Sequence, residues 1–224
     1  MKMNIFEKIN LFDFDYKVYW KKRDAKIRQR LLEREKIFFN WIKPKTKVLD
    51  VAAGNSGLLS SLKKNKMCEV YAFDISQEAI DAQNNSGVIA ERKNISLDDF
   101  NITDTYDAVI LSEILEHLPL PELLMKKIKG KANFFLVSIP NSAFYKFRLR
   151  LLFGRFFKQW IFHPSEHLRF WSHRDFLDWV DCMGFDLVKY EASNGFDVGL
   201  LKFYKYMPNL FGHQICYLLK TKIK

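Results

Sequence analysis

Short apolar runs and amphipathic segments alternate along most of the chain. The apolar runs predict strands over residues 47–51, 68–73, 87–91, 107–111 and 132–139. Apolar residues at helical spacing predict intervening helices, and these cover residues 56–64, 76–84 and 112–128. Strands that alternate with helices indicate a parallel sheet with right-handed crossovers. The pattern therefore predicts an α/β fold.

The C-terminal part of the chain continues this series. A helix is predicted over 172–183, a strand over 185–192 and a last strand over 211–221. Together with the earlier elements they make one domain, which we place at residues 45–224.

The N-terminal part has a different pattern. Residues 1–20 are aromatic and mixed, and we expect an arm packed on the domain. Apolar residues at near-helical spacing predict an amphipathic helix over 21–42, which Pro44 ends. Residues 1–44 therefore form the expected N-terminal arm and helix.

Residues 141–171 interrupt the alternation. This segment mixes aromatic and basic residues without a strand pattern or a continuous helical pattern. It follows the fifth predicted strand, and ligands of open α/β sheets bind beyond the carboxyl ends of the strands. Long functional insertions are commonly lids or binding segments. We therefore predict that residues 141–171 form a ligand-binding lid.

The turn after the first strand is the most informative motif. The sequence VLDVAAGNSGLL over residues 48–59 puts Asp50 before a run of small residues that opens a helix. Small residues let the backbone approach a ligand closely, and a helix N-terminus offers free N–H groups. The next strand ends in Asp74, where a carboxylate can accept hydrogen bonds from a ribose. The motif predicts an adenosine-containing cofactor.

Two cofactors fit this loop. Ala52-x-Gly54-x-x-Gly57 matches a loose dinucleotide fingerprint, and Asp50-x-Ala52-x-Gly54-x-Ser56 matches a loose S-adenosylmethionine (SAM) loop. A pyrophosphate binds N–H donors and positive potential, so the Asp50 carboxylate would repel it. The sulfonium and ammonium of SAM would instead be attracted, and we favour SAM. The sequence has no GxxxxGK[ST] motif, which excludes a P-loop nucleotidase.

Composition narrows the class of protein. The chain has 224 residues, of which 48% are hydrophobic, and this suits one α/β domain with a core. Scattered cysteines without a CxxC motif, no signal-peptide pattern and no apolar run long enough to cross a membrane favour a cytoplasmic protein. The net charge of +10 gathers in basic clusters over residues 21–36 and 146–174. These clusters suit a solvated face, an anionic small molecule, an RNA or an anionic membrane surface, and we do not expect DNA.

Five motifs resemble class I SAM-dependent methyltransferases, and most of all the group that includes the methionine-biosynthesis-protein-W-like and ubiquinone-type O-methyltransferases. They are VLDVAAGNSGLL (48–59), VYAFDIS (70–76), YDAVILSEILEHL (106–118), SIPN (138–141) and EHLRFWSHRDFLDWVDCMGF (166–185). The resemblance implies a Rossmann-like, seven-stranded, mostly parallel sheet with helices on both faces. It also implies an antiparallel last strand, an N-terminal helix and a lid insertion after the fifth strand. The chain departs from the family at Ala52 and Ser56, where glycines are usual.

The resemblance implies that SAM binds around the first loop and the nearby strand ends. Asp74 would bind the ribose, Ile75 would flank the adenine, and Asn94 would stand where the family often has an acid near the adenine amine. The full set of expected cofactor-binding residues is Asp50, Ala52, Gly54, Asn55, Asp74, Ile75, Asn94 and Ser112.

The segment after the fourth strand carries the candidate catalytic residues. The i, i+3, i+4 spacing of Glu113, Glu116 and His117 would place them on one helical face. Pro119 and Pro121 are expected to break that helix after His117 and restart it.

Two roles suit this segment. The catalytic set for an acid–base or acceptor-positioning role is His117, His167 and Glu113. A divalent metal would take its ligands from Glu113, Glu116, His117 and His167, or from His163. Some relatives with this pattern use a metal, including small-RNA 3′-end and ubiquinone-pathway methyltransferases, whereas many with the Glu-His pair do not. We favour the acid–base role over the metal.

The lid supplies the candidate acceptor-binding residues, which are Asn141, Tyr145, Arg148 and Arg169. A guanidinium makes bidentate contacts with a phosphate or a carboxylate. We therefore predict SAM-dependent methylation of a small anionic acceptor, most readily at oxygen. Two alternatives stay open: an accessory, non-catalytic protein of amino-acid biosynthesis, and a metal-dependent RNA- or quinone-type methyltransferase. The sequence makes no prediction of the oligomeric state.

Overall fold

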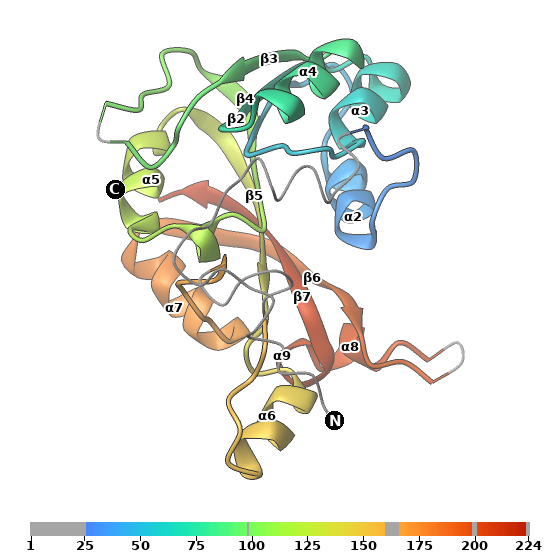
Figure 1. Ribbon diagram of the computed structural model, residues 1–224, viewed down its shortest axis with the longest axis vertical. Helices are drawn as coiled ribbons and strands as arrows, with labels where there is room; N and C mark the ends of the chain where they lie inside the picture. The colour runs from blue at the N-terminus through green and yellow to red at the C-terminus, as the bar shows by residue number, and fades with distance from the viewer. Residues whose placement is uncertain (1–25, 98, 160–165, 199–200, 223–224) are drawn as a thin grey trace, which may run out of the picture.

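A seven-stranded sheet forms the centre of the computed structural model, which describes residues 26–97, 99–159, 166–198 and 201–222 (Figure 1). The strand order is β3-β2-β1-β4-β5-β7-β6. The strands are β1 (Lys47–Val51), β2 (Glu69–Asp74), β3 (Ile89–Arg92), β4 (Tyr106–Ser112), β5 (Ala132–Pro140), β6 (Phe185–Gly195) and β7 (Gly212–Thr221). Only β7 is antiparallel to its neighbours, which are β5 and β6. The predicted fold class, with its antiparallel last strand, is confirmed.

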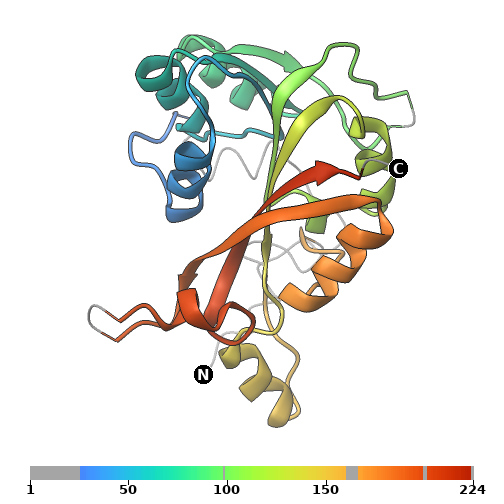
Figure 2. The same ribbon diagram turned by 180° about the vertical axis from the view of Figure 1, so that it is seen from behind.

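Helices cover both faces of the sheet (Figures 1 and 2). One face carries α2 (Glu33–Trp41), α3 (Leu58–Lys66) and α4 (Gln77–Asn85), and the other carries α5 (Pro121–Ile128) and α7 (His173–Cys182). The remaining helices are α6 (Tyr145–Leu152), α8 (Phe203–Tyr206), α9 (Pro208–Phe211) and the single 3₁₀ turn η2 (Leu115–His117). Within the described residues, no helix has the length and apolar character needed to span a bilayer.

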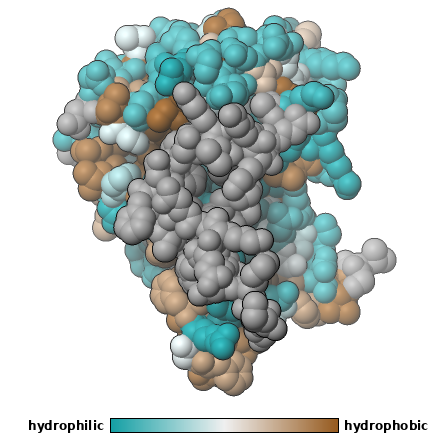
Figure 3. Space-filling model, in the orientation of Figure 1, coloured by the Kyte–Doolittle hydropathy of each residue, from teal (hydrophilic) through white to brown (hydrophobic). Residues whose placement is uncertain are grey.

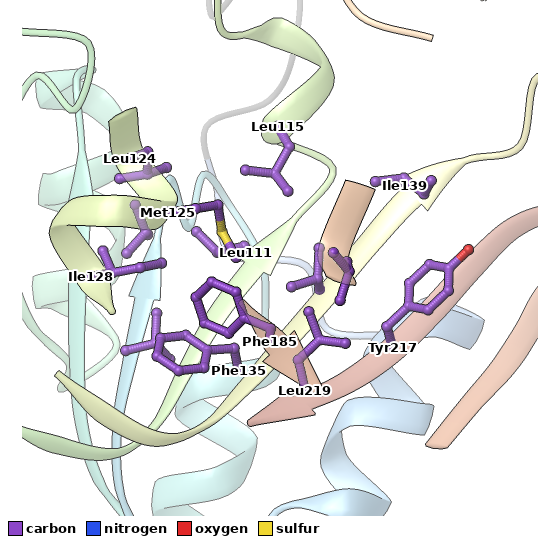
Figure 4. Close-up of a cluster of buried hydrophobic side chains, with 14 of the residues drawn as sticks. Leu111, Leu115, Leu124, Met125, Ile128, Phe135, Ile139, Phe185, Tyr217 and Leu219 are labelled. Atoms are coloured by element: carbon purple, nitrogen blue, oxygen red, sulfur yellow. The ribbon is translucent and has the colours of Figure 1, made fainter. Parts of the chain in front are cut away.

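Alternate residues of β1, β2, β4, β5 and β7 enter two separate cores. In β1, Val48 packs with α2 and α3, whereas Leu49 packs in the core that α5 and α7 cover. Figure 4 shows part of that second core, where Met125 and Ile128 of α5 meet Phe135 of β5. Strands that are buried on both faces read as uninterrupted apolar runs. This explains why the sequence pattern located them well.

The predicted helix over residues 21–42 is wrong in its described N-terminal part, because residues 26–32 are not helical and α2 begins at Glu33. The Arg28 guanidinium pairs with the Glu35 carboxylate at 2.5 Å, and the Arg28 N–H donates to the Asn55 carbonyl at 3.0 Å. The chain therefore crosses the loop after β1 before the helix starts. The expected arm over residues 1–20 lies outside the described residues.

The predicted helix over residues 112–128 is also divided. The expected break after His117 is confirmed, since α5 begins at Pro121. The segment before it is a 3₁₀ turn rather than an α-helix, and Glu113 has a φ of +54°. Glu113 is therefore not on one helical face with His117, because no α-helix links them.

The insertion at 141–171 has two parts. Its ends meet where the Ser142 N–H donates to the Trp171 carbonyl at 2.9 Å. Helix α6 extends away from the sheet at the far end of the molecule from α3 and α4 (Figures 1 and 2). Residues 166–171 return toward η2, because the Leu168 N–H donates to the Glu116 carbonyl at 2.7 Å. Among the described residues of the insertion, this returning part is the one that lies against the candidate catalytic residues.

Candidate active site

The loop between β1 and α3 has a strained backbone and close contacts. Ala52 and Gly54 have φ of +66° and +53°, in the left-handed region that favours glycine. The Ala52 N–H ties the loop to the end of β2 by donating to the Phe73 carbonyl at 2.8 Å. A Cβ at Gly57 would lie 2.2 Å from the Arg28 carbonyl oxygen, so this position has no room for a side chain.

Asp74 and Gln83 hold the loop from the side of β2 and α4. One Asp74 carboxylate oxygen accepts from the Gly54 N–H at 2.9 Å, and the other accepts from the Ser76 N–H at 2.9 Å. The fully buried Gln83 amide donates to the Gly54 and Ser56 carbonyls, both at 3.0 Å. The acid that the sequence assigned to the ribose thus also orders the loop.

Glu35 holds the loop from the side of α2. Its carboxylate accepts from the Ser56 hydroxyl at 2.8 Å, from Arg28, and from the Leu32 N–H at 2.7 Å. The serine that replaces a family glycine therefore has a dedicated buried partner. We call Glu35, Asp74 and Gln83 the loop supports.

A second group of buried acids lies within reach of the charge of Arg34, and we call Asp50, Glu113 and Glu116 the carboxyl cluster. Arg34 donates from Nε to the Ser112 hydroxyl at 3.2 Å. Its positive charge opposes the rise in pKa of all three carboxyls. Each of the three nevertheless has at least one buried oxygen without a hydrogen-bond partner among the described residues.

Burial sets the protonation of this cluster. It raises the pKa of Asp50 well above the usual range, and the negative charges of Glu35 and Asp74 add to the effect. It likewise raises the pKa of Glu116, helped by the charge of Glu113. Burial makes these groups costly to ionise, so a bound cation would stabilise their charged forms.

Two imidazoles lie beside Glu116. The rings of His117 and His167 meet edge to face with centroids 4.7 Å apart. His117 Nδ1 bonds to the Glu166 carbonyl oxygen. Burial lowers the pKa of His167 to about 4, with a further contribution from His117, so His167 is neutral near pH 7.

Glu116, His117 and His167 also satisfy a metal-ligand geometry. One ligand atom from each lies within 4.8 Å of the others. Both carboxylate oxygens of Glu116 and Nδ1 of His167 are buried without a hydrogen-bond partner among the described residues. Glu113 is not in this group; its carboxylate accepts from the Gln214 amide at 2.9 Å. His163 lies outside the described residues.

The other residues that the sequence singled out are dispersed. Asn94 makes a local turn, with its side chain accepting from the Ser96 N–H at 3.0 Å. Ile75 follows β2 directly and its carbonyl accepts from Arg92 at 3.0 Å. Asn55 lies at the outer side of the loop, where its carbonyl accepts from the Arg28 N–H.

The four expected acceptor-binding residues do not form one group. Asn141 is fully buried and bonds to backbone groups, including the Gly212 carbonyl at 2.8 Å and the His173 N–H at 3.3 Å. Tyr145 and Arg148 lie on α6, where Tyr145 packs on Phe196 and Phe211 and Arg148 donates to the Ala143 carbonyl at 2.6 Å. Arg169 instead reaches the Pro119 carbonyl, close to η2.

Arg34, Glu35 and Gln83 are site residues that sequence reasoning missed. In the sequence Arg34 stands out only as part of the basic cluster over residues 21–36. A signal existed for Gln83, because it continues the buried positions Ala79 and Ile80 of α4 at helical spacing although it is polar. A surface groove of about 1050 Å³ lies elsewhere, between residues 26–29, α3 and α4, and contains none of the expected catalytic residues.

A comparison with known families decides the class. A model of the methyltransferase domain matches residues 19–190. The chain belongs to this family. It is therefore a methyl-transferring enzyme, and its cofactor is SAM. No curated protein matches the sequence.

Solved methyltransferase structures share the fold of this methyltransferase. A SAM-dependent methyltransferase from Archaeoglobus fulgidus has 17% identity, with 92% of this chain and 100% of that chain covered and a TM-score of 0.61. Magnesium protoporphyrin IX methyltransferase from Synechocystis, with S-adenosylhomocysteine (SAH) bound, has 15% identity, coverages of 84% and 82%, and a TM-score of 0.58. A Haloferax volcanii methyltransferase complex with the Trm112 activator has 11% identity, coverages of 85% and 90%, and a TM-score of 0.60.

The residues of this chain fit SAM. The buried Asp50 oxygen without a partner lies at the end of β1, where an ammonium would satisfy it. The Asp74 carboxylate retains lone pairs beyond its two backbone bonds, so it can also accept from ribose hydroxyls.

Proposed function

We propose that this methyltransferase methylates an oxygen of a small anionic acceptor and that His117 removes the proton from that oxygen. The observation that carries the proposal is the bond between His117 Nδ1 and the Glu166 carbonyl oxygen. A carbonyl oxygen only accepts hydrogen bonds, so Nδ1 donates a ring proton in this bond. In that tautomer Nε2 is the basic nitrogen of the ring, as a general base requires. The neutral His167 adds no charge beside it.

We assign the methionine part of SAM to Asp50 and Arg34, and its ribose to Asp74. Asp50 attracts the ammonium, Arg34 binds the carboxylate, and Asp74 accepts from the ribose. The support for Arg34 is its place among Ser112 and the carboxyl cluster, where a bound carboxylate would gain a charged partner. SAM supplies an electrophilic methyl group on its sulfonium. The expected roles of Ile75 and Asn94 at the adenine stay predictions.

Arg169 is better placed than Arg148 to bind the anionic group of the acceptor. The Arg169 N–H donates to the Glu116 carbonyl at 3.1 Å, so this residue belongs to the segment that covers η2. Arg148 lies on α6 with Tyr145, and Asn141 supports the base of the insertion. Acceptor binding by any of these four residues, like methylation at oxygen, stays a prediction.

SAH release with a panel of hydroxyl compounds tests the proposal. Compounds that bear a phosphate or a carboxylate should be methylated in preference to neutral ones of the same size. His117→Gln should lower turnover by about a hundredfold or more and leave SAM affinity nearly unchanged, because a general base acts only on the acceptor. Unchanged turnover in His117→Gln, or a preference for neutral acceptors, would overturn the proposal.

A second candidate is metal-dependent methyl transfer. The unpartnered buried oxygens of Glu116 beside two imidazoles favour it. It predicts that a chelator stops turnover, that one divalent ion restores it, and that Glu116→Gln removes this dependence. Full activity in excess chelator would exclude it.

The subgroup is also a proposal. The five sequence motifs support the methionine-biosynthesis-protein-W-like or ubiquinone-type group, whose ubiquinone-type members methylate oxygen. Methylation of nitrogen but not oxygen in the acceptor panel would contradict this assignment.

A further inference from the structure

Helix α6 ends in an exposed apolar tip. Leu152, Phe153 and Phe156 are 76%, 78% and 63% exposed, and Leu149 and Leu151 beside them are also exposed. Figures 1 and 2 place α6 at one end of the molecule, and Figure 3 shows brown apolar side chains there next to teal hydrophilic ones. Single exposed apolar side chains are ordinary, but a contiguous group marks a binding surface.

The tip is held in one shape rather than left as a loose loop. Gly154 has a φ of +67°, and its N–H donates to the Leu151 carbonyl at 2.9 Å. The Arg150 guanidinium then reaches forward to the Phe156 carbonyl at 3.2 Å. These bonds keep Leu152 and Phe153 outward, because the turn between them and Phe156 is fixed.

The same segment is strongly basic. Its cations are Lys146, Arg148, Arg150, Arg155 and Lys158, and residues 141–159 contain no acid. On the inner side of α6, Phe147 is buried and packs against His213. The helix is therefore fixed to the body by one side and presents aliphatic, aromatic and cationic side chains on the other.

We propose that this α6 surface, residues 146–156, docks the methyltransferase on an anionic lipid membrane. Exposed apolar side chains beside exposed cations suit a bilayer interface, where the apolar groups enter the acyl boundary and the cations meet anionic headgroups. Three of the five exposed apolar residues are leucines, which cannot stack on bases as RNA-binding surfaces require. A protein partner would need a matching set of acidic side chains opposite the cations of this segment. The proposal does not depend on the acceptor or on the active-site assignments.

Vesicle co-sedimentation of the full chain tests it without SAM or an acceptor. The protein should bind vesicles of phosphatidylcholine mixed with phosphatidylglycerol at least tenfold more tightly than vesicles of phosphatidylcholine alone. Added salt should weaken the binding. Leu152→Ser with Phe153→Ser should lower binding at least tenfold, and Lys146→Gln with Arg155→Gln should remove the preference for anionic vesicles.

Matched variants elsewhere on the surface control for general effects. Met67→Ser with Ile89→Ser replaces exposed apolar residues, and Lys36→Gln with Lys64→Gln removes the same charge from α2 and α3. Both controls should bind vesicles like the wild type, and circular dichroism should show that every variant is folded.

Three outcomes would overturn the proposal. The first is no binding to anionic vesicles, or equal loss in the control variants. The second is tighter binding to a single-stranded RNA oligonucleotide than to vesicles, kept by Leu152→Ser with Phe153→Ser. The third is a concentration-dependent dimer that those serine changes dissociate, without vesicle binding.

Discussion

The loop supports and the carboxyl cluster both contain buried carboxyl groups, but the two regions differ in how these groups are hydrogen-bonded. Both carboxylate oxygens of Glu35 and of Asp74 accept hydrogen bonds from this chain. Asp50 and Glu116 each keep buried oxygens with no partner in the described part of the chain. An acid that is satisfied by its own protein orders the backbone, whereas an acid left unsatisfied is ready for a cation from outside.

The difference separates Glu35, which shapes the loop, from Asp50, which we assign to the ligand, whereas Asp74 has both roles. Changing a loop support should cost stability first and affinity second. Changing a member of the carboxyl cluster should cost affinity and leave the free protein intact. The predictions below follow this contrast from the largest expected effect to the smallest.

Asp50→Asn should weaken SAM binding by about 10- to 100-fold, since a hydrogen bond to a charged group contributes about 1.5–3 kcal/mol. The free protein should be as stable as the wild type or more so, because the variant removes a buried acid whose pKa burial has raised. Calorimetry with SAM and urea denaturation without it measure the two effects. Asp178→Asn, an exposed change on α7, should alter neither.

Glu35→Gln should lower the free energy of unfolding by about 1–3 kcal/mol, because it breaks the charged contact to Arg28 and weakens those to Ser56 and Leu32. Its SAM affinity should fall less than that of Asp50→Asn. Glu91→Gln removes an exposed acid and should change stability by less than about 0.5 kcal/mol. A Glu35→Gln protein of normal stability that no longer binds SAM would reverse the contrast between the two regions.

Ala52→Gly should raise the free energy of unfolding by about 1 kcal/mol, because alanine is strained at a φ of +66° and glycine is not. Ala53→Gly is the matched control. Ala53 does not have a positive φ, so glycine there should destabilise the protein by adding freedom to the unfolded chain. If both glycine variants lose stability in urea denaturation, the backbone strain at Ala52 is not an energetic cost.

The smallest expected effect is on the pH dependence of stability, and it comes from His173. This residue extends the comparison of buried polar groups from carboxyls to an imidazole. Burial lowers the pKa of His173, and its Nδ1 bonds to the Tyr217 hydroxyl at 3.0 Å. As pH falls through about 6.5, the unfolded chain takes up a proton before the folded one does, so stability falls. In urea denaturation from pH 7 to pH 5, the wild type should lose more stability than His173→Gln. Parallel losses would show that this imidazole is not responsible.

The sequence predicted the central strands well because both of their faces are covered. Val48 and Leu49 face different cores, so neighbouring residues of β1 are both apolar, and such a run indicates a buried strand rather than a loop. The sequence also placed Asp74 correctly at the end of β2, and there its carboxylate accepts from the Gly54 N–H of the loop.

Two local predictions failed for tertiary reasons. Residues 26–32 have a helical pattern, but contacts of Arg28 with Glu35 and Asn55 hold them in another conformation. Glu113 has a positive φ that its sequence does not announce. Arg34 could not be assigned to the site from the sequence, because its place depends on how α2 is rotated against the sheet. No local pattern contains that angle.

The tight contact at Gly57 links two distant parts of the sequence. The Arg28 carbonyl oxygen occupies the space that a side chain at position 57 would need. Any residue with a Cβ there must displace the backbone at position 28, which also bonds to the loop through its N–H. Evolution can therefore alter this glycine only together with the path of residues 26–32. Among relatives, a residue other than glycine at position 57 should occur together with a different backbone path over residues 26–32.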